Sequence, residues 1–226
     1  MSRITLDSDL LNYIIRTGYQ AGDRLPTLNV LQDEQHLDIG ISKVREQLEV
    51  ARALGFVEVR SKTGMRMKEY SFAPAVRVSL FFALAQNQRN FEMFGELRNH
   101  VEVAFWHEAC DRLQPEDLEA MRECISKAYA KLNSSHIGIP NEEHRNFHLI
   151  LFKRLENPFV MGILEAYWDA YEAVEVTRYA SYQYLLQVWN YHEQILDALC
   201  ASDYDHAKQL FIEHTKLIRY DSDDAR

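Results

Sequence analysis

The stretch from residue 76 to residue 220 places apolar residues at helical spacing almost without interruption, and it confines the chain to a mainly α-helical fold. Only 8 glycines and 5 prolines occur in 226 residues, so helix-breaking positions are few. Pro115 and Pro158 both stand where a first helical turn accepts proline. We therefore expect a C-terminal all-α antiparallel helical bundle. Its predicted helices are 76–85, 91–113, 116–132, 142–155, 159–177, 182–200 and 204–220.

The first 70 residues follow a second pattern, in which three short helical stretches precede two short strands. Ser42 stands before the third helical stretch as a capping residue, and Gly55 follows that stretch as a stop. Three helices and a β-hairpin wing are the plan of a winged helix-turn-helix. The expected helices are 6–16, 27–35 and 43–54, and the expected strands are 56–60 and 65–68, with the hairpin tip at 61–64.

These patterns predict two folded parts with a short connection. The winged helix-turn-helix would occupy 1–70, a linker 71–75 and the helical domain 76–220, with a tail at 221–226. No apolar run approaches the roughly 18 residues that a membrane span needs, and the N-terminus has no signal-peptide core. The 3 cysteines form no Cys-x-x-Cys pair, which favours reduced thiols. We expect a cytoplasmic protein with no membrane partner.

The net charge of −9 argues against nucleic-acid binding when it is taken over the whole chain, but the charges are unevenly distributed. Residues 1–70 have no net charge, whereas residues 71–226 carry all of the excess negative charge. Within the first part, residues 42–68 hold seven basic and three acidic side chains. A local basic excess beside an acidic domain favours contact with phosphates.

The basic residues fall where a winged helix-turn-helix touches DNA. The helix 43–54 would enter the major groove, and the wing would lie on an adjacent phosphate or minor groove. The alternative is that they form a basic surface on a small α/β cap domain, with Arg45 paired to Glu46 or Glu49. Our candidate DNA-binding residues are Thr27, Ser42, Lys43, Arg45, Arg60, Lys62, Thr63 and Gly64.

Four histidines in the helical part could form one site. His144 and His148 are four residues apart, so both lie on the same face of a helix. His192 and His214 stand at comparable places in later helices. Convergent imidazoles inside a bundle would make a transition-metal or anion site. The alternatives are ordinary structural or surface roles, and for His144 a side chain that faces solvent.

Arg98 is the candidate for binding an acidic ligand, because guanidinium matches a carboxylate in a bidentate manner. Its alternative role is an intrahelical pair with Glu102, four residues later. A group of aromatic residues could line the pocket, or could belong to the core or to a dimer surface. That group is Tyr167, Trp168, Tyr171, Tyr179, Tyr182, Tyr184 and Trp189.

Several short motifs resemble a known family of regulators. The N-terminal part is similar to the GntR winged-helix regulators, and the C-terminal part to the FCD effector domain of the FadR subfamily. The first resemblance rests on residues 22–26, 42–46, 54–57 and 63–64, and the second on residues 96–98 with Glu102, 147–148, 157–158, 191–198 and 207–214.

The resemblance implies a homodimeric cytoplasmic regulator that binds a palindromic double-stranded DNA operator. It also implies a C-terminal bundle that binds a small carboxylate effector, here through Arg98 and Glu102, and a divalent metal. The family's metal ligands map onto His148, His192 and His214, while His144 occupies the position of the usual Asp. Ligation by imidazole alone favours zinc or nickel.

We therefore predict a ligand-responsive transcriptional regulator whose effector is a small organic or sugar acid bound near the metal. A metal sensor, in which the ion itself is the signal, is the alternative. A di-iron enzyme would need Glu three residues before a histidine, and none of the four histidines has one. We expect no enzymatic activity.

Overall fold

The computed structural model describes residues 4–33, 37–61, 64–135, 138–175, 177 and 180–217. The chain forms two compact units, residues 1–78 and residues 79–226, and the boundary between them falls within one helix. None of the described helices combines the length and the apolar character that crossing a bilayer requires.

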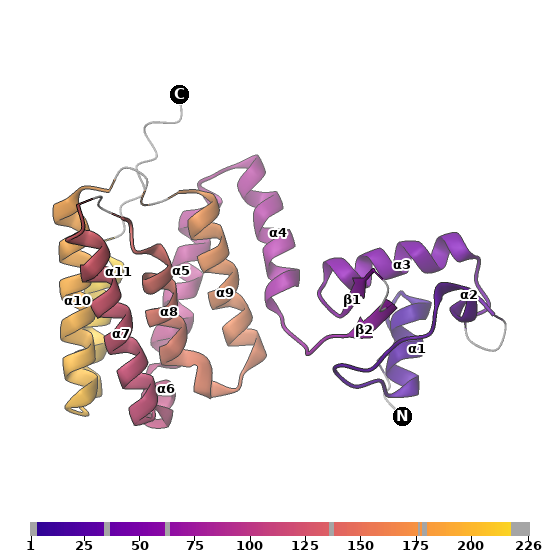
Figure 1. Ribbon diagram of the computed structural model, residues 1–226, viewed down its shortest axis with the longest axis horizontal. Helices are drawn as coiled ribbons and strands as arrows, with labels where there is room; N and C mark the ends of the chain where they lie inside the picture. Colours follow the sequence, from indigo (N-terminus) through magenta and orange to yellow (C-terminus); the bar gives the residue numbers. More distant parts are fainter. Residues whose placement is uncertain are drawn as a thin grey trace. The chain divides into compact units, whose positions relative to one another are not determined.

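The first unit contains the predicted order of three helices and a hairpin (Figure 1). Ser8 caps the first helix by accepting a hydrogen bond from the Leu11 N–H, and Gly18 ends it in the left-handed conformation. The core of the unit includes Leu10, Leu31 and Val44, all of which are almost completely buried. The elements are α1 (Asp9–Thr17), α2 (Leu28–Leu31), α3 (Ile41–Ala53), β1 (Val57–Arg60) and β2 (Gly64–Met67).

The start of α3 differs from the prediction. Ser42 was expected to cap a helix that begins at residue 43, but α3 begins at Ile41 and its N-cap residue is Gly40. The Val44 N–H donates to the Gly40 carbonyl at 3.1 Å, so the first helical hydrogen bond closes two residues earlier than expected. Ser42 is therefore an exposed residue of the first helical turn.

The end of α3 agrees with the prediction and depends on glycine. Gly55 has a φ of 78°, and the Phe56 N–H donates to the Ala51 carbonyl at 2.9 Å. A Cβ atom at position 55 would lie 2.6 Å from the Cγ of Pro74. Both the backbone conformation and the close approach of Pro74 therefore favour glycine at this position.

We expect Gly55→Ala to destabilise the protein by about 2–3 kcal/mol, because it adds the strain of a positive φ to a contact that must shift. Gly18→Ala is the matched control, since Gly18 also has a positive φ of 77° but no heavy atom within 4 Å of the added Cβ. We expect about 1 kcal/mol for this control. Urea unfolding midpoints measure both, and equal losses in the two variants would contradict the role given to Pro74.

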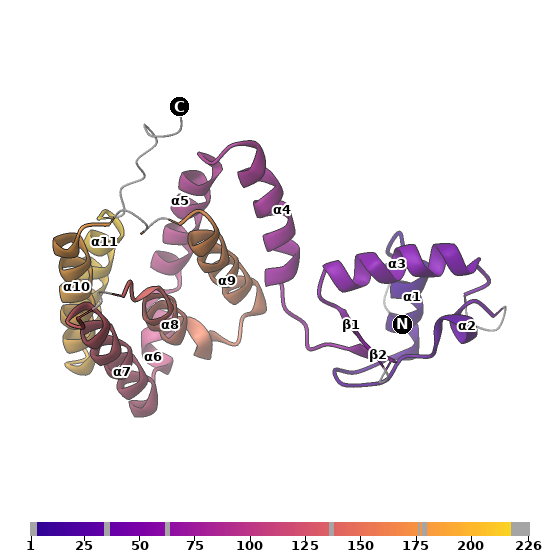
Figure 2. The same ribbon diagram turned by 45° about the horizontal axis from the view of Figure 1, so that its top comes forward.

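The second unit is an antiparallel bundle in which α8 lies between α7 and α9 (Figures 1 and 2). Its core is rich in buried aromatic side chains, among them Trp106, Phe152 and Phe211. The elements are α4 (Ala73–Gln86, shared with the first unit), α5 (Asn90–Ala104), α6 (Trp106–Arg112), α7 (Pro115–Leu132), α8 (Asn141–Phe152), the 3₁₀ helix η1 (Lys153–Leu155), α9 (Pro158–Ala173), α10 (Tyr182–Cys200) and α11 (Tyr204–Thr215).

One predicted helix is in fact two. The expected continuous helix over 91–113 is broken at Phe105, which has a φ of −93° and a ψ of 6°. No glycine or proline marks the break. The side chain of Trp106 is fully buried after it, and the Trp106 Nε1–H donates to the Tyr204 carbonyl at 2.9 Å. Packing of this indole against α11 therefore outweighs the local helical preference.

Smaller differences concern helix ends. The helix α2 covers Leu28–Leu31, shorter than the expected 27–35, of which residues 34 and 35 lie outside the described residues. The predicted helix 142–155 ends in a 3₁₀ turn from Lys153, and α9 ends at Ala173 rather than at residue 177. The last helix, α11, ends at Thr215 with Lys216 as its C-cap residue, rather than at residue 220, and residues 218–226, which include the tail 221–226, lie outside the part of the chain that the structure describes.

Candidate metal centre

Four imidazoles from three helices meet inside the second unit. His144 and His148 come from α8, His192 from α10 and His214 from α11. All four side chains are at least 95% buried, and their candidate ligand atoms lie within 4.8 Å of one another. The predicted convergence of the four histidines is therefore present in the structure.

The Nε2 atoms point toward a common centre. The Nε2 of His214 lies 3.4 Å from that of His144 and 3.3 Å from that of His148. The Nε2 of His192 lies 3.3 Å from that of His148. A tetrahedral ion with metal–nitrogen bonds of about 2.0–2.1 Å would separate its ligand atoms by about 3.3–3.4 Å. The donor set and these three separations fit a tetrahedral transition-metal ion.

The contact of the second ring nitrogen of His192 determines which nitrogen of the ring carries the proton. Its Nδ1 lies 2.7 Å from the Val188 carbonyl, which can only accept a hydrogen bond. The proton of the neutral ring is therefore on Nδ1, and the lone pair on Nε2 faces the other histidines. This is the arrangement in which a histidine is ready to bind a metal.

His148 has a different environment. Its Nδ1 lies 2.9 Å from the Nη2 of Arg98, which can only donate a hydrogen bond. The Nδ1 therefore accepts, and the proton of the neutral ring is on Nε2, inside the cluster. The Oε1 of Glu102 lies 3.5 Å from the same Nδ1. A proton on Nδ1 that faced this carboxylate would instead leave Nε2 free to bind a metal.

Burial keeps the four histidines neutral at pH 7. It lowers the pKa of His192 to about 3 and lowers the pKa of His144, His148 and His214 well below the usual 6.5. The Arg98 guanidinium adds to the effect by repelling a second positive charge. Neutral imidazole is the form that binds metals.

Arg98 and Glu102 form a buried ion pair next to the histidines. The Nε of Arg98 lies 2.7 Å from the Oε2 of Glu102, and both side chains are at most 1% exposed. Burial raises the pKa of the Glu102 carboxyl to about 7, and Arg98 opposes part of that rise. The Arg98 guanidinium also lies 4.5 Å from the centroid of the Tyr167 ring and 5.4 Å from that of Trp168.

A small cavity lies beside His144, where the chain enters α8. Its polar wall includes Asn141 and Thr177, and the Thr177 hydroxyl donates to the Asn141 side-chain oxygen at 2.9 Å. Its apolar wall includes Tyr171, Tyr184 and Trp189. One of the four histidines is therefore in contact with a space of about the size of one water molecule.

Five members of the aromatic group lie in these two places. Tyr171, Tyr184 and Trp189 line the cavity, whereas Tyr167 and Trp168 cover the guanidinium of Arg98. Tyr182 is exposed and its hydroxyl donates to the Asn133 side-chain oxygen at 3.2 Å, and Tyr179 lies outside the described residues. The sequence pattern indicated neither the contact of Tyr167 and Trp168 with Arg98 nor the Val188 carbonyl that orients His192. The one available signal for the latter was the four-residue spacing within a predicted helix.

The candidate DNA-binding residues lie in the first unit. Thr27 is the exposed N-cap residue of α2, and Gly64 opens β2 with a φ of 81°. The Nζ of Lys43 lies 3.1 Å from a carboxylate oxygen of Asp9. Arg60 is similarly held by Glu58, at 3.0 Å. Lys62 and Thr63 lie outside the described residues.

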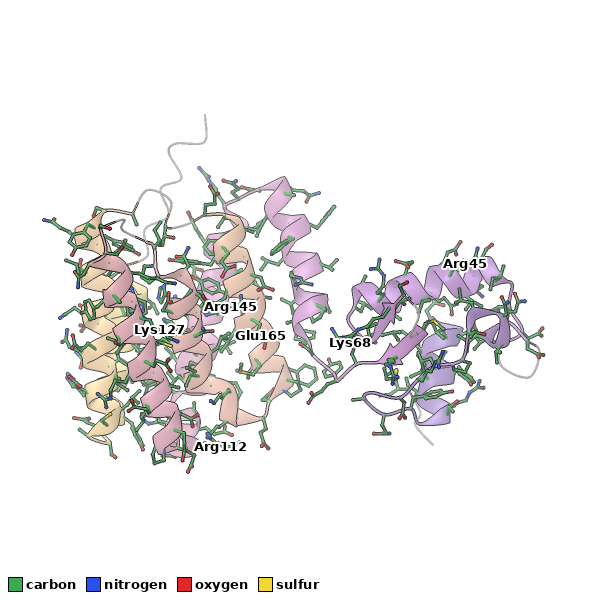
Figure 3. The ribbon with its side chains drawn as sticks, in the orientation of Figure 1. Arg45, Lys68, Arg112, Lys127, Arg145 and Glu165 are labelled. Carbon is green, nitrogen blue, oxygen red and sulfur yellow. The ribbon has the colours of Figure 1, made fainter. Side chains whose placement is uncertain are left out.

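Arg45 is exposed on α3, on the side away from α1 (Figure 3). The alternative pairing with Glu49 is not formed, because the Arg52 guanidinium binds that carboxylate at 2.6 Å. Among the residues that the structure describes, no carboxylate lies within ion-pair distance of Arg45. Its charge is therefore available to an external anion.

The comparisons agree with the architecture. The Uxu operon transcriptional regulator of Escherichia coli is 25% identical over 211 residues, which cover 91% of this chain and 80% of that protein. The HTH-type transcriptional regulator LutR of Bacillus subtilis is 22% identical over 201 residues, covering 85% and 88%. A solved GntR structure from Streptococcus agalactiae matches with a TM-score of 0.66 at 18% identity, over 92% of this chain and 94% of that one.

The family assignment rests on the second unit. The sequence profile of the FCD domain matches residues 94–217, more than half of the chain, and this range contains all four histidines together with Arg98 and Glu102. The relatives found along nearly the whole chain are transcriptional regulators and not enzymes. The chain belongs to the FCD-domain family, in the FadR subfamily of the GntR transcriptional regulators.

Proposed function

We propose that this regulator binds a palindromic DNA operator as a homodimer and responds to a small organic or sugar acid that binds beside a divalent metal ion. The observation that carries the proposal is the convergence of four neutral imidazoles next to a buried arginine. Imidazoles supply the ion with ligands, and a guanidinium supplies the hydrogen-bond donors that a carboxylate requires.

The four histidines would hold the ion, and zinc or nickel fits an all-imidazole set best. A bound ion of this kind supplies a positive charge that attracts an anionic ligand. Four neutral ligands leave that charge uncompensated, which favours an acid over a neutral metabolite as the effector. Arg98 would bind the acid, with Glu102 holding the guanidinium in place.

The DNA contacts would come from the first unit. The exposed Arg45 and the first turn of α3 would face the major groove, while Arg60 and Gly64 would bring the wing to the backbone. Ser42 lies in that first turn rather than before it, so its hydroxyl would be available to a phosphate. The acid would act by binding two arrangements of the protein with unequal affinity.

The test starts from a duplex enriched by wild-type protein from a random DNA pool. Its affinity is measured by fluorescence anisotropy for chelator-treated protein, for zinc-loaded protein, and for zinc-loaded protein with a panel of mono-, di- and tricarboxylic and sugar acids. We expect at least one acid to change the affinity roughly 10-fold, within the range of typical allosteric coupling. Zinc alone changing the affinity by the same factor would make the ion the signal instead.

The matched variant is Arg98→Gln combined with Glu102→Gln, which removes both buried charges together and leaves neither unpaired. We expect this variant to keep its affinity for DNA and to lose the response to the acid. Failure of every acid in wild-type protein would overturn the proposed effector class. A response that persists in the double variant would remove Arg98 from the effector site.

A further inference from the structure

The wing of the first unit is part of a wider sheet than its two strands. The segment before α2 runs along β2: the Leu25 N–H donates to the Met65 carbonyl at 3.0 Å, and the Met67 N–H donates to the Asp23 carbonyl at 2.9 Å. Arg24 and Arg66 form an antiparallel bridge between these hydrogen bonds. Residues 22–25 therefore extend the hairpin as a third extended segment.

The side chains of this sheet separate by face. Leu25 and Met65 are buried in the core of the unit, so their neighbours Arg24 and Arg66 are on the opposite face. In the register of β1 with β2, Glu58 is the partner of Arg66 and Arg60 is the partner of Gly64. We call this solvent side the wing face, and among the described residues it carries Arg24, Glu58, Arg60 and Arg66.

Two of the three arginines on the wing face are already engaged. Arg60 lies 3.0 Å from the Glu58 carboxylate, and the Arg66 Nη1–H donates to the Gly22 carbonyl at 2.8 Å. Arg24 is exposed, and no carboxylate of the described residues pairs with it. The one negative charge on this face is thus already paired with Arg60, which leaves the Arg24 charge available.

Arg24 is held close to the start of the wing tip. Its Nε and Nη2 atoms both lie 3.5 Å from the position that a Cβ on Gly64 would occupy. The guanidinium therefore packs along the Gly64 backbone, at the end of the hairpin where β2 begins. Because Arg24 itself is exposed, the N–H groups of this planar guanidinium are accessible to a phosphate oxygen, which they suit.

We propose that Arg24 binds a phosphate of the DNA backbone and that the wing face, rather than the hairpin alone, contacts the duplex. This inference rests on the proposed DNA-binding function and adds a contact from outside both the helix-turn-helix and the hairpin. A phosphate contact contributes affinity without sequence preference. Arg66, the bridge partner of Arg24 on β2, adds positive potential beside it, whereas the charge of Arg60 is balanced by Glu58.

The test compares full-length wild-type protein with Arg24→Ala on two duplexes, one enriched by wild type from a random pool and one with the same bases scrambled. Anisotropy is measured between 0.05 and 0.3 M KCl. One lost phosphate contact lowers the slope of log affinity against log salt by about 0.9 and weakens binding about fivefold per chain at 0.15 M salt. We expect both changes, with similar size on the two duplexes.

Two further variants make the test specific. Arg16→Ala removes the same charge from the exposed last turn of α1, and we expect it to change the affinity for DNA less than twofold. Arg24→Lys keeps the charge, and we expect it to restore the salt slope. Melting temperatures of all variants establish that the fold is retained.

The outcomes separate the two proposals. If wild type enriches no duplex, the DNA-binding function itself fails and this inference fails with it. If wild type binds DNA and Arg24→Ala keeps its slope and its affinity within twofold, only the role of Arg24 is overturned. A loss confined to the enriched duplex would also overturn it, because a phosphate contact cannot distinguish the two sequences.

Discussion

Chelator-treated protein is expected to take up about one zinc or nickel ion per chain and to gain roughly 10 °C or more in melting temperature. An ion at 1,000 times its dissociation constant stabilises the folded state by about 4 kcal/mol, and about 1 kcal/mol shifts the melting temperature of a domain of this size by roughly 2–4 °C. The ligand atoms of the four histidines already lie within 4.8 Å of one another, so binding requires no large movement of the helices and the main change is local to His148. Elemental mass spectrometry and differential scanning calorimetry measure the two effects.

The variant that tests this site is His192→Ala, because the Nδ1 contact with Val188 prepares the His192 Nε2 for coordination. We expect the bound metal and the thermal shift to be lost together. His206→Ala is the control, since His206 is exposed on α11 outside the cluster, and it should change neither. Stoichiometric metal in His192→Ala, or no shift on adding zinc to wild type, would count against the metal centre.

Acid is expected to destabilise the metal-free protein sharply below pH 6.5. Each buried histidine has a folded-state pKa below its unfolded value, so the unfolded chain binds a proton that the folded protein does not. Stability is therefore complete above pH 6.5 and is lost as the pH falls, toward about 3 in the case of His192. At pH 5 the loss is about 2 kcal/mol for His192, and His144, His148 and His214 add losses in the same direction.

Glu102 acts in the opposite direction. Its folded-state pKa of about 7 lies above its unfolded value, so the stability it contributes is present at low pH and is lost as the pH rises toward 7. Between pH 5 and pH 7, the stability that Glu102 loses as the pH rises offsets the stability gained from about one of the four histidines.

The measurement of this pH dependence is urea unfolding at pH 5.0, 6.0 and 7.5 with chelator present. In His192→Phe, the free energy of unfolding should depend less steeply on pH, and the slope should correspond to about one proton fewer. Phenylalanine fills the ring volume and does not titrate. His206→Ala should keep the wild-type dependence. A stability that does not change between pH 5.0 and 7.5 would mean that the histidines are not buried as neutral rings.

Much of the helical part could be predicted because its signals are local. Ser181 caps α10, which covers the expected residues Tyr182–Cys200, and Pro158 opens α9 after the Asn157 cap. The break at Phe105 could not be predicted, because its cause is the distant Tyr204 carbonyl that binds Trp106. Where a contact with a distant part of the chain determines the backbone conformation, the periodicity of one segment cannot indicate it.

In the candidate site too, some features follow from local sequence spacing and others depend on long-range packing. The spacing of His144 and His148 places them on one face of α8, and the spacing of Arg98 and Glu102 allows the ion pair that the structure contains. Sequence spacing alone could not show which ring nitrogen each partner contacts. The contact between Arg98 and His148 joins α5 to α8 across 50 residues, so it depends on how the two helices pack.

That contact also bears on how quickly the site would exchange its ion. The proton of His148 occupies the nitrogen that an ion needs, so loading requires the proton to leave Nε2 and the guanidinium of Arg98 to release Nδ1. Release of the ion requires the same two rearrangements in reverse, inside a cluster that is almost completely buried. We expect such a centre to exchange a bound ion only slowly with the surrounding solution. It is better suited to keeping one ion through many rounds of signalling than to following rapid changes in metal supply.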